Sequence, residues 1–466
     1  MVTYVTSASN ICYETPSLTN LFLHIKIIRP MNKKILIVLM LLTTPLSWLY
    51  AQEIKFISKK EVIDKVSSEN LSIKISKEEH NSARADYRQT NAVLLPTINV
   101  SHTGIATTNP LMAFGSKLNQ EILTPSDFDP NLLNDPDEIK NFATKIEVQQ
   151  PIINMDGFYQ RKAAKTKMQA MELQTQRTTD YLLFEVEKAY MQLQLAHKAV
   201  SVLEKANETA LANKQLAENS FKQGYLQRAD MLAVEVRVTE VQNQLQTAKS
   251  NVKNASNYLS FLMNEKEDVV LKPSDSLTLT TLEVNNEILS IDNRADIKAM
   301  QLASDAYGAM HKADKMAFLP RLNAFGSYEL YDNEIFKTDA KGYLIGAQLS
   351  WNILEGTKKF GKAQKSKADF EKSKLEYDQY VSKSNLELNQ AKRMLQDAEN
   401  KLNLTKLALD QSEESLRIRT NRFKQGLEKT TDLLMVETQY AQKQLEYYQT
   451  VFEYNYAKAY VQFLTK

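Results

Sequence analysis

The sequence predicts a mainly α-helical protein with a small β part, built as two copies of one module. Helix-breaking residues are rare, since the 466 residues include only 11 glycines and 11 prolines. Apolar residues recur with a heptad period over two long stretches of the chain. Short segments before each stretch alternate between apolar and polar residues, which is typical of β-strands with two different faces.

The amino-terminal region carries the pattern of an export signal. Met31 begins a basic start, Ile35–Leu42 forms a short apolar run, and small residues follow up to Ala51. This order predicts a secretory signal peptide over residues 31–51. The alternative is an amino-terminal membrane anchor, which the shortness of the apolar run disfavours. We interpret residues 1–30, which precede the signal, as an upstream extension that is not part of the natural product.

The rest of the chain repeats itself at an offset of about 200 residues, as expected of a duplicated module rather than a short-period array. We predict a first repeat over residues 52–284 and a second over residues 285–466. Each copy begins with a helix, expected to end at a Leu-Pro pair because the residue before a proline avoids the α conformation. The first helix is predicted from Ser58 to Leu95, before Pro96, and its counterpart from Asn285 to Leu319, before Pro320.

Two alternating segments follow each helix. The apolar residues of the four predicted strands are Ile98 and Val100; Ile146 and Val148; Leu322, Ala324 and Tyr328; and Tyr343, Ile345, Ala347, Leu349, Trp351 and Ile353. Such lengths and two-faced patterns suit tilted transmembrane strands. Half-buried strands of a soluble sheet show the same alternation, so this alternative stays open. The loop of the first pair, Ala106–Asn141, is long and polar, whereas its counterpart, Asp332–Lys341, is short.

Each copy ends in a long helical hairpin. Apolar residues step by four and three in the first copy from Leu182 to Leu203 and from Val234 to Leu262, and again in the second copy from Leu388 onward. A strict heptad predicts antiparallel helices in a left-handed coiled coil. Gly224 and Gly426 are expected to supply the left-handed residue that ends one helix and reverses the chain.

Composition and motifs exclude several classes of function. The 58 Lys and Arg residues nearly balance the 56 Asp and Glu residues, so no nucleic-acid footprint is expected. The only cysteine is Cys12, which excludes a disulfide framework and a cysteine metal site. Metalloprotease, phosphate-loop and hydrolase motifs are missing from the sequence. We therefore expect no enzyme activity, no cofactor and no bound metal.

Four strands cannot close a barrel, and open strand edges are costly in lipid. If these are membrane strands, several chains must share one barrel. Two chains would give eight strands, whose side chains nearly fill the interior, and three would give twelve, which leaves room for a pore.

The duplicated layout, the Leu-Pro pairs at Pro96 and Pro320, and the two Phe-x-x-Gly hairpin tips resemble the TolC-like outer-membrane efflux proteins, the outer membrane factors. The segment Pro151–Gly157 after a strand adds to the resemblance. The resemblance implies a homotrimer whose twelve-stranded β-barrel lies in outer-membrane lipid, above a periplasmic α-barrel of long antiparallel coiled-coil hairpins. It also implies a passive export channel of a tripartite efflux or type I secretion system.

The resemblance further implies that the hairpin tips dock a periplasmic adaptor (membrane fusion) protein and, through it, an inner-membrane pump. The implied docking residues are Phe221, Gly224, Tyr225, Phe423, Gly426 and Leu427. Asp432 and Asp230, early in the returning helices, match acids that line or link the tunnel entrance in relatives. Two positions depart from that pattern: Met435 replaces a second acid, and Glu428 replaces a basic linking residue. The alternative is that both aspartates are ordinary helix-start acids.

Two other functions are compatible with the sequence. A periplasmic coiled-coil scaffold would need the same heptads but no membrane strands. A channel for secreted protein, rather than for drugs or metals, would have the same architecture.

Overall fold

The computed structural model describes residues 54–266, 269–279 and 290–466. The predicted signal peptide, the upstream extension, the boundary between the repeats and the start predicted for the second repeat's first helix lie outside these residues. Residues Ile54–Lys466 form one structural unit.

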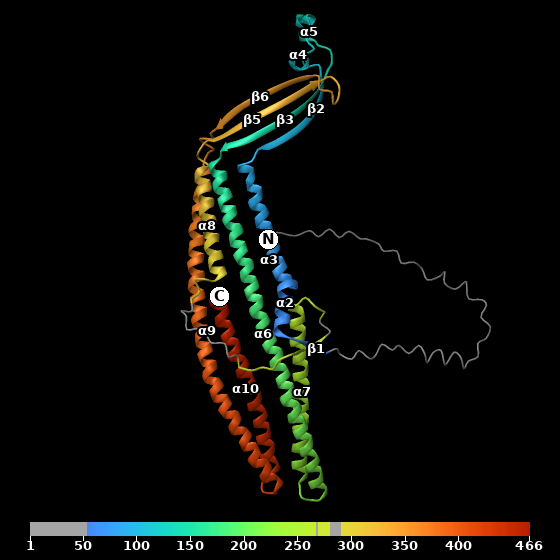
Figure 1. Cartoon of the computed structure of the whole chain (residues 1–466), viewed down its shortest axis with the longest axis vertical. Coiled ribbons are helices and arrows are strands. Elements are labelled where there is room, and N and C mark those ends of the chain that lie inside the picture. The colour runs from blue at the N-terminus through green and yellow to red at the C-terminus, as the bar shows by residue number, and fades with distance from the viewer. Residues whose placement is uncertain (1–53, 267–268, 280–289) are drawn as a thin grey trace, which may run out of the picture. The chain divides into compact units, whose positions relative to one another are not determined.

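The heptad stretches form two long helical hairpins (Figure 1). Their helices are α6 (Met155–Lys222) and α7 (Arg228–Leu262) in the first hairpin, and α9 (Lys358–Lys424) and α10 (Thr430–Thr465) in the second. With 68 residues at 1.5 Å per residue, α6 is about 100 Å long. The predicted heptad positions Leu182, Val186, Ala189 and Leu193 are buried along this helix. The predicted pairing of the hairpin helices is confirmed.

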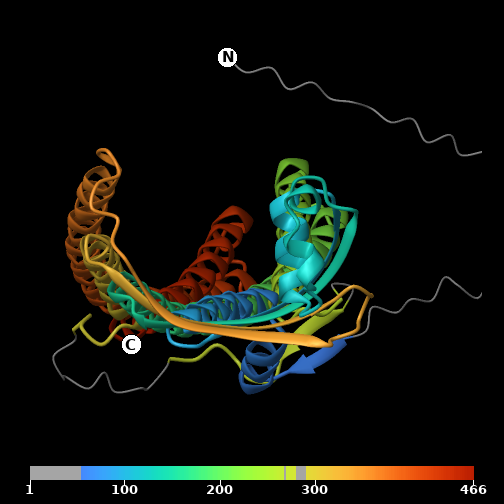
Figure 2. The same ribbon diagram turned by 90° about the horizontal axis from the view of Figure 1, so that it is seen from above.

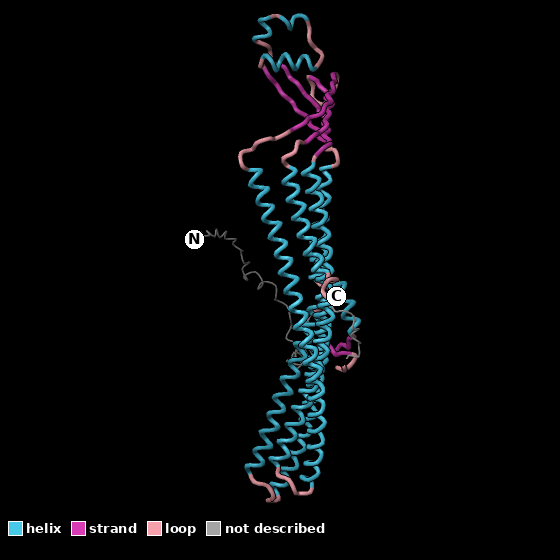
Figure 3. The backbone as a smooth tube through the Cα atoms, turned by 90° about the vertical axis from the view of Figure 1, so that its left-hand side faces the viewer, coloured by secondary structure: helices cyan, strands magenta, loops and turns pink. Residues whose placement is uncertain are grey.

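The helices α6 and α9 are longer than their hairpin partners α7 and α10. Shorter helices pack against the parts of α6 and α9 that extend beyond these partners. Toward the sheet, α6 packs against α3 (Leu71–Gln89) and α8 (Ala295–Met316), and α8 also packs against α9. Figure 3 shows these helices running alongside one another up to the strands. The first helix differs from the prediction. It begins as α2 (Lys59–Glu69) and breaks at Asn70, whose side chain caps α3 and donates to the Leu262 carbonyl.

Four strands form one antiparallel sheet in the order β2-β3-β5-β6. They are β2 (Thr97–Thr107), β3 (Ile139–Ile153), β5 (Arg321–Asp332) and β6 (Ala340–Ser350). Val100, Ile146, Tyr328 and Tyr343 are cross-strand partners. Since directly opposed residues share a face, the sheet has one apolar face through this row and one polar face. Seen from above, sheet and helices follow one open curve (Figure 2).

The loop between β2 and β3 contains structure that the alternation pattern did not predict. It folds into α4 (Pro110–Asn119), a 3-10 turn η2 (Pro125–Phe128) and α5 (Pro130–Asn134). The sequence also gave no signal for a small parallel pair, β1 (Ile54–Ile57) with β4 (Val270–Pro273). This pair lies against α6, α2 and α7.

A buried charged cluster connects the two repeats. The Asp296 carboxylate, at the start of α8, accepts from the Arg294 guanidinium at 3.0 Å and from the Tyr380 hydroxyl at 2.7 Å. Arg177 of α6 lies 3.2 Å from the same carboxylate and donates to the Phe463 carbonyl at the end of α10. The cluster therefore joins α6, α8, α9 and α10.

Candidate functional site

The two hairpin tips turn in the same way. The amide of Tyr225 donates to the Ser220 carbonyl at 2.9 Å, and the amide of Gly224 donates to the Phe221 carbonyl at 3.0 Å. Leu427 and Gly426 repeat both bonds at the second tip. This is the Schellman ending of a helix, which needs one left-handed residue. Gly224 has φ of 80° and Gly426 has φ of 75°, as the sequence predicted.

The tips expose apolar side chains. Tyr225 is 83% exposed, Leu427 is 62% exposed and Phe221 is 38% exposed. Phe423, the counterpart of Phe221, is half-buried. Large apolar side chains gathered at an exposed turn suit a protein contact, because covering them removes apolar surface from water.

The two predicted entrance acids lie where the sequence placed them. Asp230 is in the first turn of α7 and Asp432 is in the first turn of α10. Neither helix has a side-chain cap, and a carboxylate in the first turn interacts favourably with the helix dipole. Both carboxylates are half-buried. The positions of both aspartates in the single chain therefore fit the helix-start interpretation.

Glu428, the third candidate, is bound within its own hairpin. Its carboxylate accepts from Arg419 at 2.6 Å and from Arg422 at 2.9 Å, and its side chain is only 10% exposed. Glu428 thus ties the turn to the end of α9. Sequence reasoning missed the two arginines. The signal was their spacing from the turn, since residues in the last helical turns are neighbours of the two or three residues that follow the glycine.

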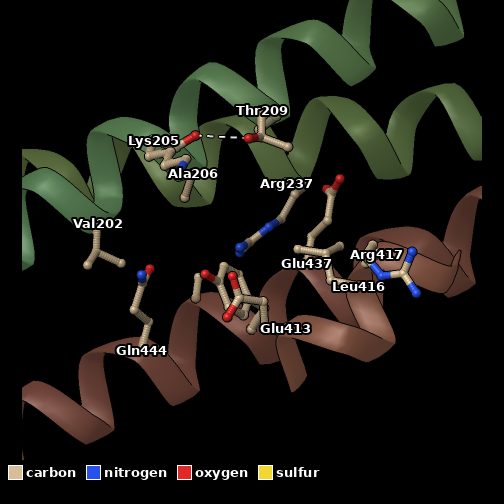
Figure 4. Close-up of a pocket in the computed structure, with 13 residues that line it drawn as sticks. Val202, Lys205, Ala206, Thr209, Arg237, Glu413, Leu416, Arg417, Glu437 and Gln444 are labelled. Carbon is tan, nitrogen blue, oxygen red and sulfur yellow. Dashed lines mark hydrogen bonds between the residues drawn. The ribbon is translucent and has the colours of Figure 1, made fainter. Parts of the chain in front are cut away.

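A cavity of about 310 Å³ lies between the two hairpins, above the tips (Figure 4). Arg237 of α7 reaches into it, facing the α9–α10 hairpin, which supplies Glu413 and Glu437. The Glu437 carboxylate accepts from the Asn213 amide of α6, so this bond links one hairpin to the other. Burial raises the pKa of Glu437 above its ordinary value, although the Asn213 bond and the Arg237 charge act in the opposite direction.

Sequence reasoning did not single out Asn213, Arg237 or Glu437. The available signal was an ionisable residue within an apolar stripe. Glu437 lies four residues after Leu433 and four before Ala441, both of which are buried. On a helix these three positions share one face. Next to the polar bond, a small apolar cluster joins the same hairpins and consists of Ala217, Met231, Val234 and Leu434.

The raised pKa makes the contact between the hairpins pH-dependent. A buried Glu with a raised pKa opposes packing once it ionises, so the penalty is absent below the ordinary value of 4.5 and grows as pH rises through the raised pKa. Glu437→Gln should remove this dependence. We expect hydrogen exchange around Asn213 and Glu437, corrected for intrinsic rates, to speed up with pH in the natural protein but not in the variant. Glu413→Gln, in the same cavity but exposed, is the control; an equal effect there would contradict the assignment.

The two Leu-Pro pairs lie at the helix-to-strand junctions. Pro96 and Pro320 each immediately precede a strand, β2 and β5. The preceding helices end earlier than predicted, because α8 stops at Met316 and a 3-10 turn ends the first helix at Val93. Side chains fix both junctions: the Gln150 amide donates to the Leu94 carbonyl at 3.0 Å and the Trp351 indole to the Phe318 carbonyl at 2.9 Å.

A membrane-crossing helix requires a long, apolar and nearly uncharged stretch. Of the helices in the described part of the chain, none has that combination.

Comparison with solved structures shows which proteins share this fold. Several solved outer-membrane channels have the same fold. One is the CmeC outer membrane channel of Campylobacter jejuni, with a TM-score of 0.76 and 16% identity, covering 87% of this chain and 85% of that chain. A membrane protein of Pseudomonas aeruginosa matches with a TM-score of 0.77 and 16% identity, covering 88% of this chain and 93% of that chain. At such identity the likeness concerns the fold.

Sequence comparison gives the family. The profile described as "Outer membrane efflux protein" matches residues 62–265 and 289–463. The chain therefore belongs to the outer membrane efflux protein family. It is also 24% identical over 213 residues to "Toxin and drug export protein A" of Aggregatibacter actinomycetemcomitans. That alignment covers 43% of this chain and 45% of the relative, so it spans less than half of either protein.

Proposed function

We propose that this protein is the outer-membrane channel of a tripartite export system. The observation that supports this proposal is that one chain of the outer membrane efflux protein family contains both a sheet with one apolar and one polar face and two long helical hairpins. In the proposed assembly, three copies join the free edges of β2 and β6 into a twelve-stranded barrel in the outer membrane. The apolar face contacts lipid and the polar face lines the lumen. The hairpins form a tunnel that extends into the periplasm.

Transport through this channel is passive. The energy comes from an inner-membrane pump, which an adaptor protein connects to the hairpin tips. Tyr225 and Leu427 supply exposed apolar contact surface for the adaptor, and the inter-hairpin contact at Asn213 and Glu437 holds the tips closed until docking shifts it. We infer that the cargo is a drug or a toxin, in agreement with the name of the export relative.

Fractionation and reconstitution test the proposal. We expect heat-modifiable trimers in the outer membrane and discrete conductance steps when the full-length protein is added to planar bilayers. A soluble, elongated protein without conductance would instead support the scaffold alternative. Loss of the gene should raise the accumulation of a fluorescent dye in the cell; unchanged dye accumulation together with loss of a secreted protein would favour the secretion alternative.

Asp432 is the entrance residue with the clearest electrical signature. If three copies face one another, each pair repels by about 1 kcal/mol at 4 Å in water. Such a ring attracts cations, so Asp432→Asn should weaken block by a periplasmic-side multivalent cation about fivefold, equivalent to about 1 kcal/mol. Single-channel block measures this change. Asp378→Asn, at an exposed acid in the first third of α9 and far from the tip, should leave the block unchanged. Equal cation block in the two variants would show that Asp432 does not line the entrance.

A further inference from the structure

The β2–β3 excursion is folded inward, over the polar face of the sheet. The Gln120 amide, at the end of α4, donates to the Asn141 side chain at 2.8 Å and to the Lys140 carbonyl at 2.8 Å. Asn141 pairs with Ile105 and lies an even number of residues from Lys145 and Glu147, so it belongs to the polar face. The apolar face lies on the other side of the strand. In the proposed channel, α4 therefore leans over the lumen.

One side of α4 is used to hold it there. Ala113, Ser116 and Gln120 are 1%, 5% and 5% exposed and follow the spacing of one helix face. The ion pair from Lys117 to Asp127, at 2.7 Å, fixes the turn after α4. The Lys117 hydrogen bond, with bonds from Thr124, lowers the pKa of Asp127 to about 2.

The opposite side of α4 is apolar and uncovered. Leu111 is 81% exposed and Leu118 is 55% exposed. At 100° per residue, these two leucines lie about 180° and 160° from Gln120 around the helix axis. Met112 lies about 80° from Gln120 and so sits on the flank of the helix. We call Leu111 and Leu118 the α4 stripe. Because the anchored side faces the chain's own sheet, the stripe faces away from it, toward the centre of the lumen.

The geometry points to sister copies as the occupants of this stripe. Helix α4 begins three residues after β2, and β2 is the edge strand that the proposed trimer joins to β6 of the next copy. The excursion thus leaves the sheet at the seam between copies. Three-fold symmetry directs three identical stripes toward one axis. We propose that these stripes meet at the outer opening and narrow it with an apolar constriction, of the kind that restricts ion flow by excluding water.

The second outer loop supplies a matched contrast. Phe336, between β5 and β6, is 76% exposed, and its ring stacks on His102 at 4.7 Å. His102 lies two residues from Val100, on the apolar face. This loop therefore bends away from the lumen, and Phe336 should not approach its symmetry mates.

Cysteine cross-linking tests the inference, which rests on the proposed trimeric channel. In a Cys12→Ser background the chain has no other cysteine. Leu111→Cys treated with a short bis-maleimide should give covalent dimers at least about tenfold more efficiently than Phe336→Cys, because proximity raises the effective concentration. Cross-linking should also lower the single-channel conductance. Leu111→Asp with Leu118→Asp should raise the conductance roughly twofold by wetting the constriction.

The outcomes separate the two proposals. Trimers that conduct normally but show no preferential Leu111→Cys cross-linking, or no response to the aspartates, would overturn the constriction and leave the channel standing. A protein that forms neither trimers nor conductance steps would overturn both. Since α4 lies outside the sheet, its variants should form trimers in unchanged yield, and this yield is measured as the folding control. The untreated Leu111→Cys protein is the reference for conductance.

Discussion

Asp296→Ala is expected to lower the free energy of unfolding by about 3–5 kcal/mol, because it leaves two buried guanidinium groups without their shared carboxylate. The Arg294 and Arg177 side chains are only 3% and 9% exposed, so water cannot replace the lost partner. Thermal unfolding of the detergent-solubilised protein, followed by circular dichroism, measures the loss. A change below about 1 kcal/mol would show that the cluster is not a stabilising tie.

Two comparisons sharpen this experiment. Replacing the charges together, with Arg177→Met, Asp296→Leu and Arg294→Met, should cost much less than the single change, because no charge is left buried alone. Glu334→Ala breaks an exposed ion pair with Lys337 and should cost less than about 0.5 kcal/mol.

The cluster also makes the free energy of unfolding depend on pH, and the direction of the Asp296 pKa shift determines the sign. Burial by itself would raise the pKa of Asp296, but hydrogen bonds from Arg294 and Tyr380 and the charge of Arg177 hold it below the ordinary value. A depressed carboxyl pKa stabilises the fold above the ordinary value of 3.8, and the contribution is lost as pH falls through the lowered pKa. The stabilising contribution of Asp296 is therefore lost only under strongly acidic conditions. Glu437 acts in the opposite direction, because its contribution becomes unfavourable as pH rises.

The second large effect is expected at the tips. Tyr225→Asp combined with Leu427→Asp should reduce export by at least about tenfold, because central apolar anchors of an interface each contribute about 2 kcal/mol or more. Dye efflux in a host carrying the cognate pump and adaptor measures the loss. Trimer yield and conductance of the purified channel should be unchanged, since both side chains are exposed turn residues.

The apolar pair Tyr225→Phe and Leu427→Met is the matched control, and it should keep most of the export activity. Full efflux in the aspartate variant would show that the adaptor does not dock on these side chains. Loss of trimers in that variant would instead assign Tyr225 and Leu427 to assembly.

The features that the sequence predicted well are those with a local periodic cause. Heptads specify which helix faces meet, alternation specifies the two faces of the sheet, and a glycine after a long helix specifies the turn. These patterns located both hairpins, the four main strands and the two tip glycines. The resemblance then supplied the class, which the family match confirms.

The missed features depend on contacts between distant residues. The pairing of Ile54 with Val270 joins four-residue strands far apart in the chain, and such short strands leave no periodic trace. The break at Asn70 is decided by a bond to Leu262, and the environment of Glu428 by which arginine side chains reach it. The polar loop before β3 folded because two prolines and their preceding cap residues start its short helices.

The position of the buried cluster has a mechanical consequence. Arg177 fastens α6 part-way along its length, and about 45 residues of that helix, roughly 70 Å, continue from there to the tip. A swing of about 5° around this fulcrum carries the far end roughly 6 Å sideways, whereas the shorter arm, about 33 Å long, moves the strand end only about 3 Å. Small rotations at one anchor are thus enough for a wide aperture at the other end, without bending either rod.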